Sequence, residues 1–543
     1  MRFSKWFTGS LVMIGVAVAL GLTLLSVKTA QAQAPEERVF RAGAATSNIT
    51  PPLGVSLGGA MRDRSATHVR DELHARCVVL DDGSARIALV QVDNCLIPRQ
   101  VFDAAKKLIE NETGIPASHV LMAATHSHST PTATGIFQSD PNVDYLPFLQ
   151  RRIADGVRRA ANNLEPARIA WGSGELPGEV FNRRWFLTPD TVLENPFGGR
   201  DQVRMNPGRA SEALLEPAGP TDPEISIIAL ESIDNRPIAV LANYSLHYVG
   251  GISDSHVSAD YYGLFADRIQ ELLGADRLQP PFVGIMSNGT SGDINNINFR
   301  EPGTSRQPGE QMAHVAQAAA DVVYAAYNRL EWQDWVALGA MTKDLELGVR
   351  LPSEEDVARA RDVVAAAKGP IMETMVEIYA RETILLNEYP ETVIAPVQAL
   401  RIGSLSIAAI PCEVFAEMGL QIKAESPFED AFTIELANGY YGYLPTPRQH
   451  ELGGYETWRA RSSYLEPNAS EVIMAAVRDL FQQLHRGNRA NNQNPAVYRA
   501  RLSRPAGQTR SQGSRAGWGA CAPPGRLDPA WERQYAANPP SQR

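Results

Sequence analysis

The chain has 543 residues, of which 44% are apolar, and a formal net charge of −10. Its charge is unevenly distributed. Residues 487–543 contain nine arginines against two acidic residues and carry +7, residues 1–32 carry +3, and residues 33–486 therefore carry −20. An acidic body repels phosphate backbones, which argues against nucleic acid as a partner. The apolar residues are spread evenly over residues 33–486, which predicts one large body.

Residues 1–32 have the composition of a secretory signal peptide. Arg2, Lys5 and Lys28 are their charged residues, and Ala30-Gln31-Ala32 offers a small-x-small cleavage site. We therefore expect export, to the periplasm or the medium. The uncharged stretch between Lys5 and Lys28 is 22 residues long. Because about 20 residues span a bilayer, an uncleaved N-terminal membrane anchor is the alternative.

The hydrophobic pattern of the body alternates between short apolar runs, which predict strands, and longer amphipathic segments, which predict helices. This alternation predicts an α/β fold with layered mixed sheets. In chain order we expect a strand over 86–92, a helix over 101–112, a strand over 119–123, a helix over 146–164, strands near 225 and 237, a helix over 261–273, a strand near 283, and helices over 311–327, 413–425 and 469–485.

Two segments depart from this alternation. Charged helices over 354–368 and 372–387, separated by Gly369-Pro370, predict a helical hairpin inserted between strands. We favour an outer packing layer as its role, with a lid over a cleft as the alternative. Residues 487–543 are rich in Pro, Gly, Ser, Asn, Gln and Arg without periodicity, which predicts a disordered basic tail. A solvated tail is favoured, and peripheral contact with anionic lipid is the alternative.

Histidines follow two of the apolar runs. The run over 119–123 is followed by His126 and His128, and the run over 240–246 ends in His247. Side chains at the carboxyl ends of strands meet at one edge of a sheet, where α/β folds place their sites. Zinc in hydrolytic sites takes three or four nitrogen and oxygen ligands and keeps a position for water. These histidines therefore predict a zinc site at the strand ends.

Two further runs deliver oxygen ligands in the same way. The run over 405–412 ends in Glu413, and the run over 432–438 is followed by a cluster of tyrosines. The alternatives are structural. His126 would then be a core histidine bonded to a carbonyl, and Glu413 would be an acid at the start of the helix predicted over 413–425.

Several motifs, in collinear order over about residues 40–486, give the chain a resemblance to the neutral/alkaline non-lysosomal ceramidases. No single motif is specific, but their order and spacing together are. The motifs are Asn48-Ile49-Thr50-Pro51-Pro52, Thr125-His126-Ser127-His128-Ser129, Asn182-Arg183, Leu246-His247, Ser287-Asn288 through Gly292-Asp293, the Pro-x-Glu turn at Glu413, and Asn438 through Tyr455.

The resemblance implies a zinc-dependent amidohydrolase with one Zn²⁺ per chain. Tyr443 rather than Tyr440 is the implied tyrosine ligand because the family's ligand lies five residues after the asparagine that is Asn438 here. His128 would then act as general acid/base, and Arg183 and Tyr455 would stabilise the oxyanion. The implied zinc ligands are His126, His247, Glu413 and Tyr443.

One position departs from the family pattern. The family has Gly-Asp-Val-Ser-Pro-Asn, whereas this chain has Gly292-Asp293-Ile294-Asn295-Asn296-Ile297, so that Asn295 replaces a serine near the metal. An amide is not a nucleophile but can hydrogen-bond, and we expect Asn295 to orient substrate while zinc-activated water attacks. A hydroxyl of the preceding loop, from Ser287, Thr290 or Ser291, could compensate for the missing serine.

These observations predict a secreted hydrolase of a ceramide-like or other small-molecule or lipid amide. The alternatives are a zinc esterase or peptidase-like hydrolase on the same scaffold and a non-catalytic exported binding protein, which Asn295 favours. We expect only a tail after residue 486, in place of the immunoglobulin-like module that commonly follows in the family, and this expectation weakens the inference to a membrane lipid. The sequence does not predict an oligomeric state.

Overall fold

A computed structural model describes residues 38–276 and 280–492 of the chain. The predicted signal peptide and nearly all of the predicted tail lie outside these residues. Among the described helices we find none whose length and hydropathy would let it cross a bilayer.

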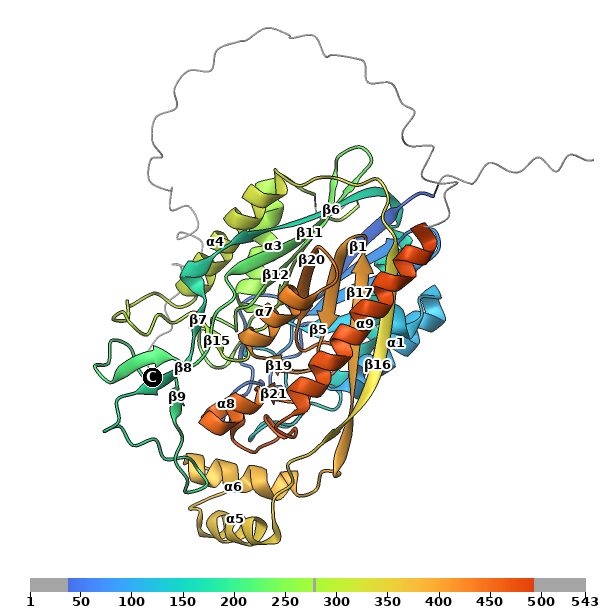
Figure 1. Ribbon diagram of the computed structural model, residues 1–543. Coiled ribbons are helices and arrows are strands. Elements are labelled where there is room, and N and C mark those ends of the chain that lie inside the picture. The colour runs from blue at the N-terminus through green and yellow to red at the C-terminus, as the bar shows by residue number, and fades with distance from the viewer. Residues whose placement is uncertain (1–37, 277–279, 493–543) are drawn as a thin grey trace, which may run out of the picture. The chain divides into compact units, whose positions relative to one another are not determined.

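Two mixed sheets, of eight and four strands, form the centre of the body (Figure 1). Their strands are β1 (Arg41–Asn48), β3 (His74–Asp81), β4 (Arg86–Val92), β5 (Val120–Ala124), β6 (Glu165–Glu175), β11 (Glu224–Ser232), β12 (Pro237–Tyr244), β14 (Val283–Asn288), β16 (Leu338–Gly348), β17 (Thr392–Ile402), β18 (Leu405–Ala409) and β20 (Asp430–Ile434). The larger sheet has the order β14-β12-β11-β6-β1-β3-β4-β5 and the smaller β16-β17-β18-β20. The pairs β4–β5, β12–β14 and β18–β20 are parallel, and the other neighbours are antiparallel.

Helices cover the outer faces of both sheets, so that the body has four layers, with helices outside and sheets inside. These helices are α1 (Arg99–Thr113), α2 (Tyr145–Asn162), α3 (Asp260–Leu273), α4 (Glu310–Tyr327), α7 (Ala416–Glu425) and α9 (Ala469–Asn492). Helices α1 to α4 pack on the larger sheet, and α7 and α9 on the smaller. The predicted α/β fold with layered mixed sheets is confirmed.

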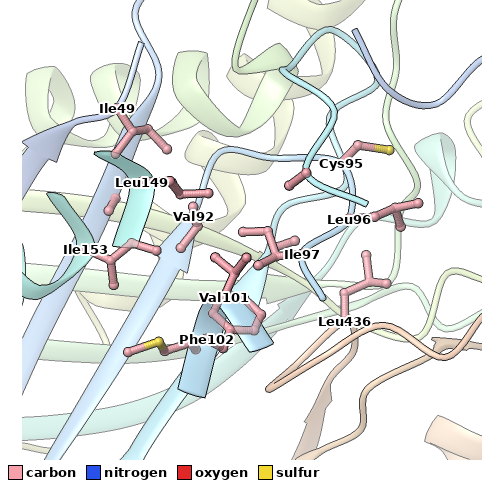
Figure 2. Packing of buried hydrophobic residues seen from close by; sticks show 14 of the residues in the cluster. Ile49, Val92, Cys95, Leu96, Ile97, Val101, Phe102, Leu149, Ile153 and Leu436 are labelled. Carbon is pink, nitrogen blue, oxygen red and sulfur yellow. The ribbon is translucent and has the colours of Figure 1, made fainter. Parts of the chain in front are cut away.

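Strand β4 shows how the sequence pattern produces these layers. Successive side chains of a strand point to opposite faces. Ile87 and Leu89 therefore lie between the two sheets, whereas Val90 and Val92 pack under α1 and α2. Figure 2 shows Val92 in this second core beside residues of α1. Because both faces of the strand are buried, the sequence shows a continuous apolar run.

Short strands and turns join the layers and shape the loops. They are β2 (His68–Val69), β7 (Phe181–Asn182), β8 (Arg184–Leu187), β9 (Val203–Met205), β10 (Leu214–Pro217), β13 (His256–Val257), β15 (Ile294–Asn295), β19 (Glu413–Val414), β21 (Tyr443–Leu444), η1 (Ala117–His119), η2 (Pro177–Glu179), α8 (Pro447–Leu452) and η3 (Tyr455–Thr457). The expected helix start at Glu413 is wrong, because Glu413 lies in β19, paired in parallel with Tyr443 of β21, and α7 begins at Ala416.

The segment after β20 connects the two ends of the larger sheet. The Glu435 N–H donates to Asn288 O at the end of β14 (3.2 Å), and Asn438 N–H donates to Met122 O of β5 (2.7 Å). Between them, Ala437 forms a β-bridge with Ala123. The carboxyl ends of β5, β12, β14, β18 and β20 therefore open on one region.

The predicted helical hairpin is present between β16 and β17, as α5 (Glu354–Ala366) and α6 (Met375–Leu386). Its second helix packs against the segment that follows Tyr455. Glu382 accepts hydrogen bonds from Arg461 Nη2 (2.8 Å) and Nε (2.9 Å), and the ring of Tyr379 meets that of Trp458 edge to face at 5.3 Å. The hairpin thus contacts loops near the strand ends as well as covering the body.

Candidate metal centre

The structure brings His126, His247 and Glu413 together. The two Nε2 atoms are 3.0 Å apart, and Glu413 Oε2 lies 3.2 Å from Nε2 of His126 and 3.9 Å from Nε2 of His247. The three ligand atoms lie within 4.8 Å of one another, and all three residues are buried. His126 and Glu413 lie 121 and 166 positions from His247 in the sequence. The three side chains meet because the strands that carry them end in the same region.

The hydrogen bonds of the two imidazoles leave their Nε2 lone pairs directed at this point. Nδ1 of His126 lies 3.1 Å from Cys95 O, and Nδ1 of His247 lies 3.0 Å from Ser291 O. A carbonyl oxygen can only accept, so each Nδ1 carries the hydrogen and each Nε2 is a bare acceptor in the neutral ring. This is the arrangement that metal-binding histidines adopt.

Glu413 completes a set of donors that suits a cation. Its Oε1 accepts a hydrogen bond from Tyr440 OH at 3.1 Å, but its Oε2, in a residue that is 2% exposed, has no hydrogen-bond partner. An unsatisfied buried charge costs more than the roughly 1–3 kcal/mol of an unsatisfied neutral group. Two imidazole nitrogens and one carboxylate oxygen are ligands that Zn²⁺ accepts, so the residues present fit the metal.

The backbone at this region is strained. His126, Leu436 and Asn438 have φ values of +74°, +52° and +63°, in the left-handed region that side chains other than glycine seldom occupy. Each such residue costs on the order of 1–3 kcal/mol and persists where the surrounding structure imposes it, often at functional sites. Three of the eight non-glycine residues with positive φ in the described part of the chain therefore lie in the segments that carry or flank the ligands.

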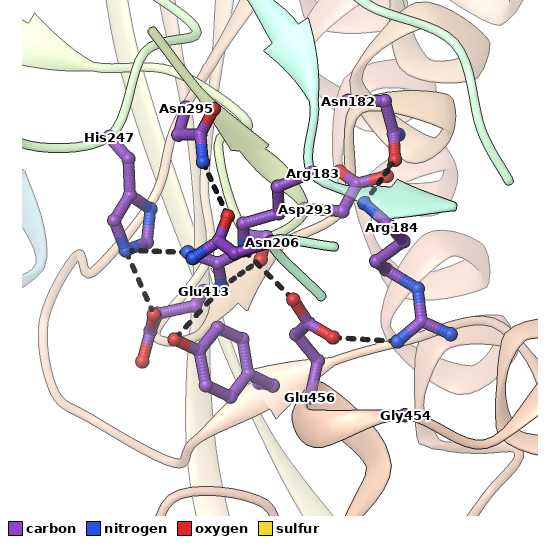
Figure 3. Close-up of polar contacts among 12 residues, drawn as sticks. Asn182, Arg183, Arg184, Asn206, His247, Asp293, Asn295, Glu413, Gly454 and Glu456 are labelled. Carbon is purple, nitrogen blue, oxygen red and sulfur yellow. Dashed lines mark hydrogen bonds and ion pairs between the residues drawn. The ribbon is translucent and has the colours of Figure 1, made fainter. Parts of the chain in front are cut away.

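A buried ion network lies beside the three ligands (Figure 3). Glu456 accepts from Arg183 Nε at 2.8 Å and from Arg184 Nη1 at 2.6 Å, so that both of its oxygens face a guanidinium. Burial acts to raise the pKa of Glu456, but Arg184 and Arg183 together outweigh it and hold that pKa below its ordinary value. The carboxylate stays charged and fixes both arginines.

Arg183 connects this network to the ligands. Its Nη2 donates to Gly292 O at 2.8 Å and to Tyr443 OH at 3.1 Å, and its Nη1 lies 3.2 Å from Nε2 of His247. Burial and the charge of Glu413 raise the pKa of Tyr443 well above its ordinary value. The phenol is thus neutral without a cation, and it lies in β21 directly opposite Glu413.

His128 occupies the rim of the same centre. Its Nε2 is 3.3 Å from Nε2 of His126, and its ring stacks on Tyr248 with centroids 3.7 Å apart. Gly59, at φ +88°, lies close to the same ring. A Cβ there would come within 2.4 Å of His128 Cγ, so the close approach requires glycine. Tyr455 stands next to Tyr443, with ring centroids 5.8 Å apart.

Both polar atoms of the Asn295 side chain form hydrogen bonds. Its Nδ2 donates to Asn206 Oδ1 at 2.7 Å, as Figure 3 shows, and its Oδ1 accepts from Ile297 N–H at 2.9 Å. The hydroxyls of the preceding loop each have a hydrogen-bond partner. Ser287 donates to Ala242 O, Thr290 pairs with Ser245, and Ser291 donates to Glu435.

Two residues of the centre were not assigned a role from the sequence. Glu435 is fully buried behind Ser291, and burial raises its pKa to about 8. An acid at the end of the apolar run over 432–438 was a signal that could have found it, since buried carboxylates are rare without a role. Glu456 had no such local signal, because its partners lie more than 270 positions away in the chain.

Comparisons with known proteins agree with this architecture. Residues 40–317 match the model of the family described as neutral/alkaline non-lysosomal ceramidase, N-terminal. The neutral ceramidase of Pseudomonas aeruginosa is 22% identical over 486 residues, covering 77% of this chain and 68% of the relative. The neutral ceramidase of Mycobacterium tuberculosis is 21% identical over 473 residues, covering 74% and 70%.

Solved structures show the same fold. The crystal structure of the neutral ceramidase from Pseudomonas aeruginosa superposes with a TM-score of 0.60 at 19% identity, over 82% of this chain and 74% of the other. A structure titled ceramidase complexed with C2 gives the same TM-score and coverage at 17% identity. The family match covers more than half of the chain, including His126, His128, Arg183, His247 and Asn295. The chain belongs to the neutral/alkaline non-lysosomal ceramidase family.

Proposed function

We propose that this protein is an exported, zinc-dependent amidohydrolase that cleaves the N-acyl bond of a ceramide-like lipid amide. Family membership supports an amidohydrolase, and the relatives named above are neutral ceramidases. The observation that carries the zinc dependence is the convergence of two imidazole lone pairs on a buried carboxylate oxygen without a hydrogen-bond partner.

His126, His247 and Glu413 would hold the zinc, with Tyr443 as the fourth ligand. Tyr443 lies opposite Glu413 in β21, and it shares Arg183 with His247. When bound, zinc supplies a water of lowered pKa and polarises a carbonyl oxygen. Tyr440 donates to the other oxygen of Glu413, which leaves Oε2 directed at the metal position.

The remaining side chains would bind substrate and move the proton. Arg183 is fixed by Glu456 and Gly292 O, so its N–H groups are preorganised to stabilise negative charge that develops on the carbonyl oxygen. Tyr455, beside Tyr443, would donate to the same oxygen. His128, which stacks on Tyr248 and lies close to Gly59, would carry a proton from the attacking water to the leaving nitrogen.

The test combines metal analysis with a substrate panel. Wild-type protein, His126→Ala, His247→Ala and the control His314→Ala, whose side chain is 49% exposed on α4, are compared for zinc content. Each is assayed on an N-acyl sphingoid base, an N-acyl amino acid and an ester. We expect about one zinc per chain and amide hydrolysis in wild type and control, and neither in the two ligand variants. Full zinc content in either ligand variant would disprove the ligand set, and a preference for the ester would disprove the amide assignment.

A further inference from the structure

Glu435 is a buried carboxylate that binds Ser291 and Val414. Ser291 is the hydrogen-bond partner of the ligand His247, and Val414 follows the ligand Glu413 in the sequence. It is 0% exposed. Its Oε1 accepts from Ser291 Oγ at 2.7 Å, and its Oε2 accepts from Val414 N–H at 2.6 Å and from Ser291 N–H at 3.3 Å. Within the described part of the chain no arginine or lysine forms an ion pair with it. Three donors from two separate segments therefore satisfy both carboxyl oxygens of Glu435 in the interior.

The first of these loops carries the partner of His247. Ser291 presents its carbonyl oxygen 3.0 Å and its hydroxyl oxygen 3.3 Å from Nδ1 of His247. Because the hydroxyl hydrogen is given to Glu435, the hydroxyl oxygen faces the imidazole N–H as an acceptor. Glu435 thereby favours the tautomer that leaves Nε2 free for a cation.

The second loop carries Glu413. Val414 follows it directly in β19, and the bond from Val414 N–H to Glu435 fixes the backbone plane next to the ligand. The backbone of Glu435 is itself tied to β14 through Asn288 O. Through its side chain and its backbone, Glu435 thus joins three of the segments whose ends form the centre.

We propose that Glu435 is a positioning residue for the metal: through Ser291 it orients His247, and through Val414 it orients Glu413. This inference rests on the proposed function. Second-shell partners of this kind typically change metal affinity about 10–100-fold when they are removed.

The competing explanation is that Glu435 serves the fold alone. Glu382 provides a matched control, because it is also 0% exposed and accepts three hydrogen bonds from Arg461, but it lies in α6 of the hairpin and contacts none of the three ligands. If burial of a carboxylate were all that mattered, Glu435→Gln and Glu382→Gln would lower stability alike and leave metal affinity alike.

The experiment measures zinc affinity by competition with a chromophoric chelator, and the visible spectrum after replacement of zinc by cobalt, in four proteins: wild type, Glu435→Gln, Ser291→Ala and Glu382→Gln. We expect zinc affinity to fall about 10–100-fold in Glu435→Gln, to fall less in Ser291→Ala, and to stay unchanged in Glu382→Gln, with an altered cobalt spectrum in the first two.

The outcomes separate the two proposals. If wild-type protein binds no zinc, the proposed function fails. If wild type binds zinc and Glu435→Gln binds it equally well with the same cobalt spectrum, the positioning role is wrong. Should Glu435→Gln not fold, Ser291→Ala decides, because it keeps the carboxylate and the Ser291 carbonyl and removes only the hydroxyl that lies between Glu435 and His247. An affinity and a cobalt spectrum equal to those of wild type would overturn the inference.

Discussion

Glu413 and Glu456 are buried carboxylates near the same centre, but they differ in what faces them. Glu456 has a guanidinium on each oxygen, from Arg183 and Arg184. Glu413 has a phenol on one oxygen and no hydrogen-bond partner on the other. The first is neutralised by two guanidiniums of the chain, whereas the second faces the imidazoles of His126 and His247, with its Oε2 at 3.2 and 3.9 Å from their Nε2 atoms.

This difference separates structural from functional use of a buried charge. A buried ion pair holds its geometry but contributes little net stability, because desolvation offsets the attraction. A buried carboxylate left without a partner is costly, and under the proposed function a cation from solution removes that cost. The paired residue should therefore matter to folding and the unpaired one to metal and activity.

The largest expected effect is on activity when the unpaired oxygen is removed. Glu413→Gln keeps the acceptor for Tyr440 OH but takes the charge from the metal position. We expect amide hydrolysis to fall at least about 10³-fold, equivalent to roughly 4 kcal/mol of transition-state stabilisation, together with loss of zinc. The metal-free variant should be no less stable than metal-free wild type in urea unfolding. Retained activity, or a large loss of metal-free stability, would break the comparison.

The next effect is on stability when the paired carboxylate is neutralised. Glu456→Gln leaves two buried guanidiniums without a counter-charge, and breaking a buried pair costs about 3–5 kcal/mol. Urea unfolding of the metal-free protein at neutral pH measures this loss. The control is Glu373→Gln, whose carboxylate is 56% exposed and paired with Arg62, and which should change stability by about 0–1 kcal/mol. Equal effects of the two variants would show that the Glu456 network is not a buried structural pair.

The sequence predicted the elements whose signals are local. The strand over 86–92 agrees with β4, and the helix over 261–273 agrees with α3 to within one residue, because their hydrophobic faces repeat with the period of the element. The second hairpin helix was expected from residue 372 but begins at Met375. A capping box between Thr374 and Glu377 marks that start and could have been used.

The parts that could not be predicted depend on contacts between distant residues. Glu413 was expected to open a helix, but it pairs with Tyr443, thirty positions later, in a two-residue strand too short to leave a hydrophobic pattern. The pairing of Glu456 with two consecutive arginines likewise has no local trace. The resemblance brought His126, His247 and Glu413 into one hypothesis, and the geometry shows that they meet.

A smaller effect sharpens the comparison through pH. The pKa of Glu456 lies below its ordinary value in the folded protein, so its contribution to stability is present above the ordinary carboxyl pKa of about 4.3 and is lost as pH falls through the folded value. Urea unfolding between about pH 6 and pH 3 should show a steeper decline in wild type than in Glu456→Gln, by up to about 1.4 kcal/mol per pH unit. Parallel curves would contradict a depressed pKa at this residue.

The smallest effect is expected at Asn295. A substitution there tests whether the metal held by Glu413 and the two histidines is sufficient for hydrolysis without the family's serine. The amide of Asn295 is bonded to Asn206 and to Ile297 N–H, and no hydrogen bond links it to the three metal ligands among the described residues. If the nucleophile is a water activated by zinc, the family's serine is not required. Asn295→Ser should then shift substrate preference by a few-fold, with zinc content equal in both proteins, and Asn295→Ala should separate the loss of the amide from the gain of a hydroxyl. A gain above about 10³-fold in Asn295→Ser alone, roughly 4 kcal/mol, would show that the hydroxyl is needed and that the wild-type chain is better described as a binding protein.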